Sequence, residues 1–332
     1  MEVVSLEQWI LTFVMFAVIL GYEVWHALRH PHQPSIKSSA IWSVVYVLAA
    51  LAFAGVIYEI WDRNFAVEYI TGYVTERALS IDNLFVFILI MSSFAVPRQL
   101  QQLVMICGVA IAIVLRAIFI WLGAAIIEEF SWVFYIFGAF LLITAWKLIG
   151  SGNEHDDGEY QENGFIRMVR RAVPVTDTWE GSKLWVRKYG KFMITPLALV
   201  MLAIGSTDLL FAFDSIPAIF GITNEPYIVF TANAWALMGM VQLYFLLGGL
   251  LERLVYLSYG LAFILALIGV KLIIHAMHHN TLPFINHGHH IDVIPEISTI
   301  ASLVLIILAL VVAAIFSLRK TAGDDADALS PS

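Results

Sequence analysis

Nine long apolar stretches constrain this chain more than any other feature of its sequence. A transmembrane helix needs about 20 consecutive, mostly apolar residues. The stretches that qualify are 8–28, 41–61, 66–90, 101–126, 132–150, 192–217, 226–249, 255–276 and 297–317. The composition agrees, because 60% of the residues are hydrophobic and 13% are charged, against roughly half and a quarter in soluble domains. The sequence therefore predicts an all-α polytopic membrane protein with about nine transmembrane helices.

The Lys and Arg residues are unevenly divided between the two sides of these helices. With the N-terminus outside, the outer loops hold only Arg63. The cytoplasmic side then holds seven in the long connection 151–191, together with Arg29, Lys37, Arg98, Arg253, Arg319 and Lys320. Cytoplasmic loops carry such an excess of positive charge, so we expect an outer N-terminus and a cytoplasmic C-terminus. The first stretch has no preceding Lys or Arg and no cleavage site, which predicts a retained helix.

Two of the apolar stretches contain the same acidic pattern. Each copy has a Thr, a carboxylate next to it, a second carboxylate six residues later and then a small polar residue. The first copy comprises Thr75, Glu76, Asp82 and Asn83, and the second comprises Thr207, Asp208, Asp214 and Ser215. Placing a charged side chain at the centre of a bilayer costs on the order of 2.5–3.5 kcal/mol of free energy. Four acids inside apolar helices therefore indicate that a cation binds to them.

The helices that follow each copy make two similar three-helix units. Both units continue with a Leu-Gly step and reach a Lys-Leu-Ile sequence, at Lys147 and at Lys271. A three-span unit repeated in tandem inserts upside down the second time, and inverted repeats place a substrate site near the midplane. The expected organisation is two N-terminal helices in 1–65, a first repeat in 66–150, a cytoplasmic loop in 151–191, an inverted second repeat in 192–276, and a His-rich outer loop, last helix and cytoplasmic tail in 277–332.

Helical geometry divides these candidate ligands into two sets. Residues seven apart share a face of a helix, whereas residues six apart differ by about 120°. Glu76 and Asp208 are therefore a possible second ion or proton site. An inner cage near the midplane would consist of Asp82, Asn83, Asp214 and Ser215.

All of these ligands offer oxygen atoms, which hard divalent cations such as Mn²⁺, Mg²⁺ and Ca²⁺ prefer. Zn²⁺ and Cu⁺ more often bring His or Cys, and the single Cys107 lies in an apolar run. We expect no resident cofactor, because the chain has no nucleotide-binding glycine motif. The net charge of −8 does not suggest nucleic-acid binding. The sequence shows no readable nucleophile–base arrangement, so we do not expect an enzyme.

A purely structural interpretation of the acids remains open, in which they pair with nearby basic side chains. The candidate partners, which are also possible gating residues, are Arg77, Arg116, Lys147 and Lys271. Lys147 and Lys271 are expected to extend toward helix ends, whereas Arg116 lies deeper. Asn233 either adds an oxygen ligand or makes a hydrogen bond between helices.

The histidines form a second group with an open interpretation. Six of the ten lie in one region, at His275, His278, His279, His287, His289 and His290. Such a loop is either a solvated connection, a site for a softer metal, or a group that responds to pH near 6–7.

At these motifs the chain resembles the TerC family of membrane proteins, and within it the Alx-like manganese exporters. The matching segments are 71–76, 79–83, 96–97, 115–116, 135–140, 176–178, 211–218 and 244–247. The resemblance implies a bacterial plasma-membrane exporter of Mn²⁺. It also implies that the acids Glu76, Asp82, Asp208 and Asp214 bind the ion.

Two positions depart from the family pattern. Gly205 stands where members often have Glu, and Gly239-Met240-Val241 stands where they often have an Arg after the Gly. We expect export of Mn²⁺, or a related ion such as Ca²⁺, by alternating access and in exchange for protons. The alternative is an accessory protein that uses the 151–191 loop to deliver metal to, or to assemble, other membrane or secreted proteins. The sequence leaves the oligomeric state open.

Overall fold

The computed structural model describes residues 4–29, 34–129, 132–151, 164–176, 178–188, 191–247, 256–278 and 297–328, with eight positions between 280 and 295. The elements are α1 (Leu6–Arg29), α2 (Ile36–Ile60), α3 (Arg63–Ser93), α4 (Arg98–Glu129), α5 (Val133–Ser151), α6 (Gly164–Ala172), β1 (Trp185–Lys188), β2 (Lys191–Ile194), α7 (Pro196–Phe220), α8 (Pro226–Met238), α9 (Met240–Leu247), α10 (Leu257–His278) and α11 (Thr299–Ala328). The all-α character predicted from the sequence is confirmed.

Within the residues that the structure describes, seven helical segments are long and apolar enough to cross a membrane. They are Leu6–Arg29, Ile36–Ile60, Arg98–Ala125, Pro196–Phe213, Pro226–Leu246, Tyr259–His278 and Thr299–Ser317. Helix α5 is a shorter apolar helix, and α3 includes the charged Glu68, Glu76, Arg77 and Asp82. The chain is therefore a polytopic membrane protein, while the count of nine spans and the inverted repeat stay predictions.

Two details of the chain were not expected from the sequence. The 151–191 connection contains the short helix α6 and strand β1, which pairs with β2 in an antiparallel hairpin, Trp185 with Ile194 and Lys188 with Lys191. Residues 192–194, predicted as the start of a membrane helix, belong to β2, and α7 begins at Pro196. The stretch predicted as one helix over 226–249 is divided into α8 and α9 at Gly239. Apolar periodicity does not report such local interruptions, because both halves of the broken helix are equally apolar.

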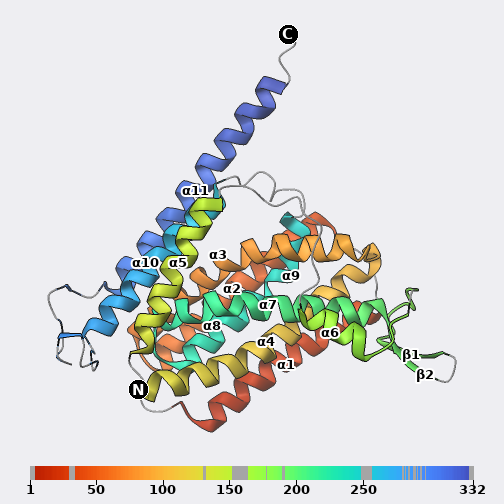
Figure 1. Cartoon of the computed structure of the whole chain (residues 1–332), viewed down its shortest axis with the longest axis horizontal. Coiled ribbons are helices and arrows are strands. Elements are labelled where there is room, and N and C mark those ends of the chain that lie inside the picture. The colour runs from red at the N-terminus through yellow and green to blue at the C-terminus, as the bar shows by residue number, and fades with distance from the viewer. Residues whose placement is uncertain are drawn as a thin grey trace.

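Four helices form the centre of the molecule. Helix α3 packs on α8 and α4 packs on α7, and these two pairs also contact each other. Helix α8 lies deepest, because every residue from Tyr227 to Met238 is buried. Helices α1 and α2 cover one side, and α5, α10 and α11 lie on the other, with α11 extending beyond the bundle (Figure 1).

Glycines set the closest helix crossings. A β-carbon on Gly205 of α7 would lie 2.5 Å from Cγ2 of Ile111 on α4. At the crossing of α5 and α10, a β-carbon on Gly138 would lie 2.8 Å from the backbone oxygen of Gly269. Helices that touch through small residues approach closely, which is the packing that membrane helices favour.

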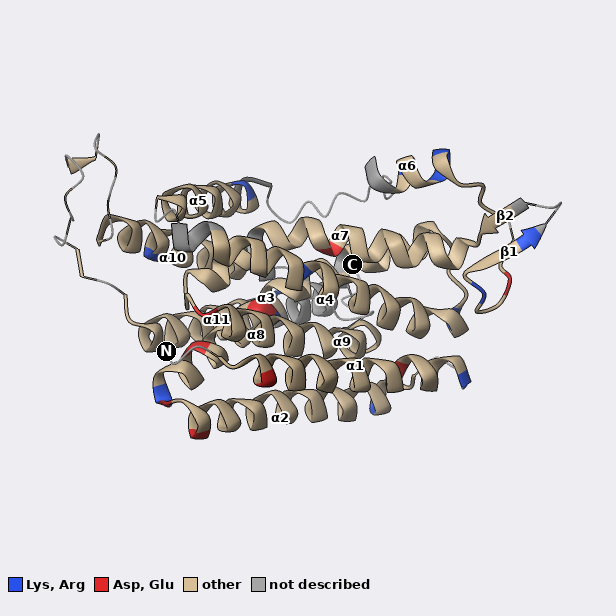
Figure 2. Ribbon diagram, turned by 90° about the horizontal axis from the view of Figure 1, so that it is seen from below, with Lys and Arg blue, Asp and Glu red and all other residues tan. Residues whose placement is uncertain are grey.

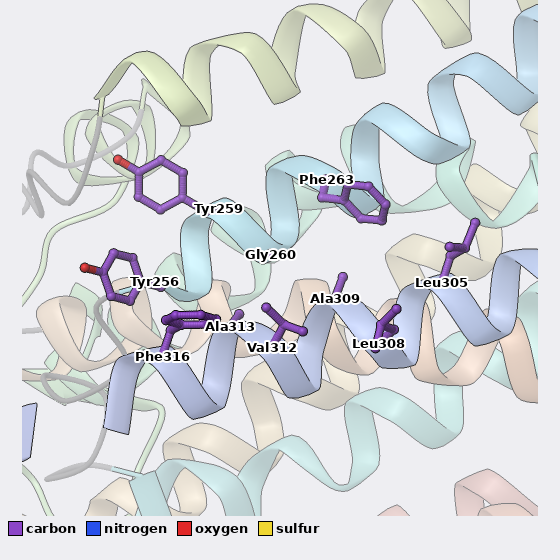
Figure 3. A pocket seen from close by; sticks show the side chains of 10 residues that line it. All are labelled: Tyr256, Tyr259, Gly260, Phe263, Leu305, Leu308, Ala309, Val312, Ala313 and Phe316. Atoms are coloured by element: carbon purple, nitrogen blue, oxygen red, sulfur yellow. The ribbon is translucent and has the colours of Figure 1, made fainter. Parts of the chain in front are cut away.

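The outer surface of the bundle suits a bilayer. Large apolar side chains are exposed along α1, α2 and α11, and the Lys and Arg residues lie mostly toward the ends of helices and in the hairpin (Figure 2). A groove of about 460 Å³ runs between α10 and α11 and is lined by apolar and aromatic residues (Figure 3). Its lining residues include no Asp or Glu, so the groove offers no carboxylate ligand for a metal ion.

Candidate functional site

A single arginine occupies the centre of the four-helix core. Arg116 of α4 is 1% exposed. Its guanidinium donates two hydrogen bonds to the carboxylate of Asp208 on α7. Nε donates to Oδ2 at 2.8 Å, and Nη2 donates to Oδ1 at 3.2 Å. This fork-shaped, charge-assisted geometry is the strongest that an arginine and a carboxylate make.

The third nitrogen of the guanidinium joins the other two core helices. Nη1 of Arg116 forms an ion pair with Oε1 of Glu76 on α3. It also donates to Oδ1 of Asn233 on α8 at 2.6 Å and to Oγ of Ser215 on α7 at 3.1 Å. One guanidinium therefore connects side chains of α3, α7 and α8 to α4. The Arg116 cluster comprises Arg116, Glu76, Asp208, Ser215 and Asn233.

Neighbouring groups hold two members of the cluster in place. Ser80, one turn after Glu76, donates to Oε1 of Glu76 at 3.3 Å. Nδ2 of Asn233 donates to the carbonyl of Val229 at 2.9 Å, so the amide oxygen faces Arg116. The positions of both acceptors are thus fixed by hydrogen bonds within their own helices.

The acids of the cluster outnumber its one base. Glu76 and Asp208 are both fully buried and share the single guanidinium. Among the described residues, Oε2 of Glu76 has no hydrogen-bond partner. A buried acceptor without a partner is costly, so this oxygen is available to a proton or to a cation.

The cluster lies deep along its helices. Glu76 is 13 residues after the start of α3, and Asp208 is 12 residues after the start of α7, which corresponds to about 20 and 18 Å of helix. The hydrocarbon core of a bilayer is about 30 Å thick. Each acid therefore lies near the middle of its own helix, at a depth comparable to half the thickness of a bilayer core.

A small cavity adjoins the cluster. It measures about 110 Å³ and is lined by Asn83 of α3, Ser215 of α7, Thr144 of α5 and five apolar residues. Ser215 thus contacts Arg116 and also lines this cavity. The two sets expected from helical spacing are connected here, because Ser215 of the inner set contacts the arginine that binds Glu76 and Asp208.

The two remaining predicted acids fall at positions with limited description. Asp82 and Asp214 lie within α3 and α7, but their side chains are outside the described part of the structure. The predicted inner cage therefore keeps Asn83 and Ser215 as its described members. The roles of Asp82 and Asp214 stay predictions from the sequence.

The predicted charge partners lie in different surroundings. Arg116 forms buried ion pairs with two of the acids, an interpretation that the sequence left open, whereas Lys147 is exposed on α5. Lys271 lies in a different cavity, of about 410 Å³, where it attracts the carboxylate of Glu68. Thr223 donates to Oε2 of Glu68 at 2.5 Å in the same place. Glu68 was not among the predicted site residues, although an acid near the start of an apolar helix was a usable signal.

The His-rich region is described in part. His275 packs edge-on against Phe134, and Nε2 of His278 lies 2.7 Å from the carbonyl oxygen of Ile294. His279, His287 and His290 are outside the described residues. Within the described part of the chain, no group of three His, Cys, Asp or Glu side chains is arranged to hold a metal.

With the site in place, comparison with known proteins identifies the family. A model of the integral membrane protein TerC family matches residues 61–324. The chain belongs to the TerC family. The match covers α3 to α10 and most of α11, and so includes every member of the Arg116 cluster.

Similar TerC-family relatives are known from several bacteria. An uncharacterized membrane protein of Mycobacterium tuberculosis is 46% identical over 301 residues, which are 90% of this chain and 76% of the relative. A putative membrane-bound redox modulator, Alx, of Escherichia coli is 39% identical over 275 residues, covering 80% of this chain and 85% of the relative. The resemblance to Alx proteins is thus confirmed. No solved structure gives a significant match.

The structure gives a physical reason for one departure from the expected TerC-family pattern. Gly205 touches Ile111 so closely that no larger side chain fits there without a shift of α4 or α7. At the other position, Val241 is buried and the preceding break at Gly239 lies against Arg77 of α3. Nη1 of Arg77 donates to the carbonyl of Ala236 at 2.9 Å. A cation therefore does lie at the end of α8, supplied by α3.

Proposed function

We propose that this protein exports Mn²⁺, or a related hard divalent cation such as Ca²⁺, by alternating access and in exchange for protons. The membrane would be the plasma membrane of a bacterium, with the N-terminus outside. The observation that carries the proposal is the Arg116 cluster, in which two buried carboxylates share one guanidinium. Such a charge arrangement inside an apolar bundle is a functional-site hypothesis by default.

Competition between Arg116 and the ion is the first step of the proposed mechanism. A divalent cation that binds Glu76 and Asp208 would displace the guanidinium from at least one of them. The ion brings two positive charges to two acids, whereas Arg116 brings one. Oε2 of Glu76, which has no hydrogen-bond partner among the described residues, offers a first oxygen ligand. The oxygens of Asn233 and Ser215 are already directed at the same point.

Alternating access is supported by the pairing of the helices. Helix α3 packs on α8 just as α4 packs on α7, and α5 packs directly on α10. This exchange of partners is what two inverted three-helix units would produce around a shared axis. Rocking of one unit against the other would open the Arg116 cluster to alternate sides.

A polar cavity lies on the expected outer end of this path. Glu68, Lys271 and Thr223 line it together with Asn224 and His275. All of these residues are near the helix ends that the distribution of Lys and Arg places outside the cell. The cavity supports an outer vestibule through which the ion would leave.

A second candidate function rests on the hairpin of β1 and β2. Trp185 is 66% and Phe192 is 68% exposed on these strands, in the loop expected to face the cytoplasm. Exposed aromatic residues in a solvated segment favour contact with another protein, which fits an accessory role in metal delivery or assembly. Redox exchange through a disulfide within one chain is not available, because Cys107 is the single cysteine.

Flux measurements on purified protein in liposomes test the proposal. We expect uptake of Mn²⁺ into vesicles by the wild type, and loss of uptake in Glu76→Gln and Asp208→Asn, which keep the side-chain shape but remove the charge. Glu7→Gln, exposed at the start of α1, is the matched control and should transport normally. Parallel measurements with Ca²⁺, Mg²⁺ and Zn²⁺ establish the preference.

Three further variants test the two candidate functions in cells. Asp82→Ala and Asp214→Ala should lose protection from excess Mn²⁺ if the protein is an exporter. Deletion of the 151–191 loop should spare most transport by an exporter, but should abolish the activity of an accessory protein. Wild-type Mn²⁺ flux in both Glu76→Gln and Asp208→Asn would refute the exporter.

A further inference from the structure

A second polar cavity lies at the opposite end of the bundle from Glu68. It measures about 270 Å³ and is lined from α1, α2, α4 and α9 by Ile19, Tyr22, Glu23, His26, Pro34, Ser38, Trp42, Tyr46, Gln102 and Gln242. Gln102 precedes Arg116 by 14 residues on α4, or about 21 Å of helix. The cavity is therefore separate from the Arg116 cluster.

Its polar groups include two oxygen acceptors that lack partners. Tyr46 donates its hydroxyl hydrogen to Oε1 of Glu23. Oε2 of Glu23 and Oε1 of Gln102 are both buried and have no hydrogen-bond partner among the described residues. The ion pairs found in the described part of the chain both involve Arg116, so no ion pair to Glu23 is present there. A ligand with a positive charge and N–H donors would satisfy both oxygens.

The walls of the cavity distinguish an organic cation from a metal ion. Aromatic rings line it on two sides, with Tyr22 from α1 and Trp42 and Tyr46 from α2. The faces of Tyr and Trp attract ammonium groups. Hard metal ions such as Ca²⁺ need six to eight oxygen ligands, whereas Glu23 is the single carboxylate in this lining.

The mouth of the cavity opens at a defined depth. Tyr22 and Trp42 are 59% and 49% exposed. Glu23 is six residues before the end of α1, and Trp42 is six residues after the start of α2, or about 9 Å from each helix end. Tyr and Trp are enriched at membrane–water interfaces, so these exposed rings near helix ends indicate that the mouth lies close to one. Charged headgroups and water-soluble amines both reach it.

We propose that this cavity binds a small organic ammonium ion. Its N–H groups donate to Oε2 of Glu23 and Oε1 of Gln102, and its carbon atoms rest against Tyr22 and Trp42. The same chemistry is offered by the headgroup of an aminophospholipid and by a free primary amine. The inference is independent of Mn²⁺ export, because none of these residues belongs to the Arg116 cluster.

Binding measurements on the full-length protein test the proposal and separate the two sources. Ethanolamine and phosphoethanolamine are titrated by calorimetry in detergent. Native mass spectrometry then compares retention of phosphatidylethanolamine with that of phosphatidylcholine and phosphatidylglycerol. We expect at least one primary-amine source to bind. Its trimethylammonium counterpart should bind more weakly because it has no N–H donor.

Variants assign the binding to this cavity. Glu23→Gln should weaken the interaction about tenfold or more, because it removes a charge-assisted hydrogen bond. Gln102→Met, which keeps the side-chain length without the oxygen, should weaken it by a smaller factor. Glu7→Gln on the same helix should have no effect, and Mn²⁺ flux should persist in both cavity variants.

Three results would overturn the proposal. The first is that neither amine source binds the wild type. The second is that Glu23→Gln and Gln102→Met bind amines as tightly as the wild type does. The third is that the cavity binds Mn²⁺, rather than an amine, in a manner that depends on Glu23.

Discussion

Arg116 and Asp208 form a two-pronged ion pair between α4 and α7, with Nε to Oδ2 at 2.8 Å and Nη2 to Oδ1 at 3.2 Å. Their helices cross where Gly205 meets Ile111, one turn of α7 before the acid. The close crossing brings the two backbones together, and the ion pair spans the gap beside it. The geometry of the cluster therefore depends on a glycine that has no ligand chemistry of its own.

Loss of the central cation should destabilise the fold strongly. Arg116→Met leaves Glu76 and Asp208 buried without a counter-charge, and breaking a buried ion pair costs about 3–5 kcal/mol. The midpoint of thermal unfolding in detergent, followed by tryptophan fluorescence, should fall accordingly. Lys147→Met, at an exposed position, should change stability by no more than about 0.5 kcal/mol.

The charge balance can be tested by removing the acids as well. Arg116→Met combined with Glu76→Gln and Asp208→Asn should recover much of the lost stability, because none of the charges of the Arg116 cluster remains buried. A triple variant as unstable as Arg116→Met would show that packing, rather than charge, explains the loss.

Gly205 is expected to tolerate no larger side chain. Gly205→Ala places a β-carbon 2.5 Å from Cγ2 of Ile111, and such overpacking typically costs about 1–3 kcal/mol. Ile111→Ala in the same chain should relieve part of this cost. Gly55→Ala is the control, since nothing lies within 4 Å of its β-carbon, and this change should be neutral or slightly stabilising. Equal unfolding midpoints for Gly205→Ala and Gly55→Ala would contradict the packing argument.

Gly239 and Arg77 are expected to act as one unit. A β-carbon on Gly239 would lie 2.9 Å from Cζ of Arg77 and would push the guanidinium away from the carbonyl of Ala236. Gly239→Ala and Arg77→Met should each destabilise by about 1.5–3 kcal/mol, the value of a hydrogen bond from a charged group. In the double variant the losses should not add, because both changes break the same contact. Additive losses of stability would contradict a shared contact between Gly239 and Arg77. Gly21→Ala, whose β-carbon has open space around it, is the control for the effect of Gly→Ala on helix propensity.

Protons should compete with the transported ion. If Mn²⁺ and H⁺ use the same carboxylates, the apparent affinity for Mn²⁺ falls as the pH is lowered, since the ligands must be deprotonated to bind metal. Uptake of Mn²⁺ into vesicles should release protons from the lumen, measured with an enclosed pH-sensitive dye. Asp208→Asn should abolish both the uptake of Mn²⁺ and the release of protons. Mn²⁺ uptake with no proton movement would leave transport in place but reject the exchange.

The sequence was a good guide to the helices and a partial guide to the site. Most of the described residues in the long apolar stretches are helical, apart from 192–194 in β2 and the break at Gly239, because a chain in hydrocarbon must satisfy its backbone hydrogen bonds within a helix. The spacing of Asp208 and Ser215 placed both on one face, and both do contact Arg116. The break at Gly239 and the β1–β2 hairpin were not predicted, because neither interrupts the apolar stretches of the sequence.

The chain alone determined that this is an all-α membrane protein with acids inside its helices, since apolar length and charge are properties of the sequence. Which acids meet which base was decided only by the tertiary structure. Arg116 is 40 residues from Glu76 and 92 from Asp208, and its side chain could have paired with either acid, with both, or with neither. The packing of α4 against α7 and α8, and of α3 against the same two helices, brings both acids to one guanidinium, because a buried charge is stable only where its partners converge.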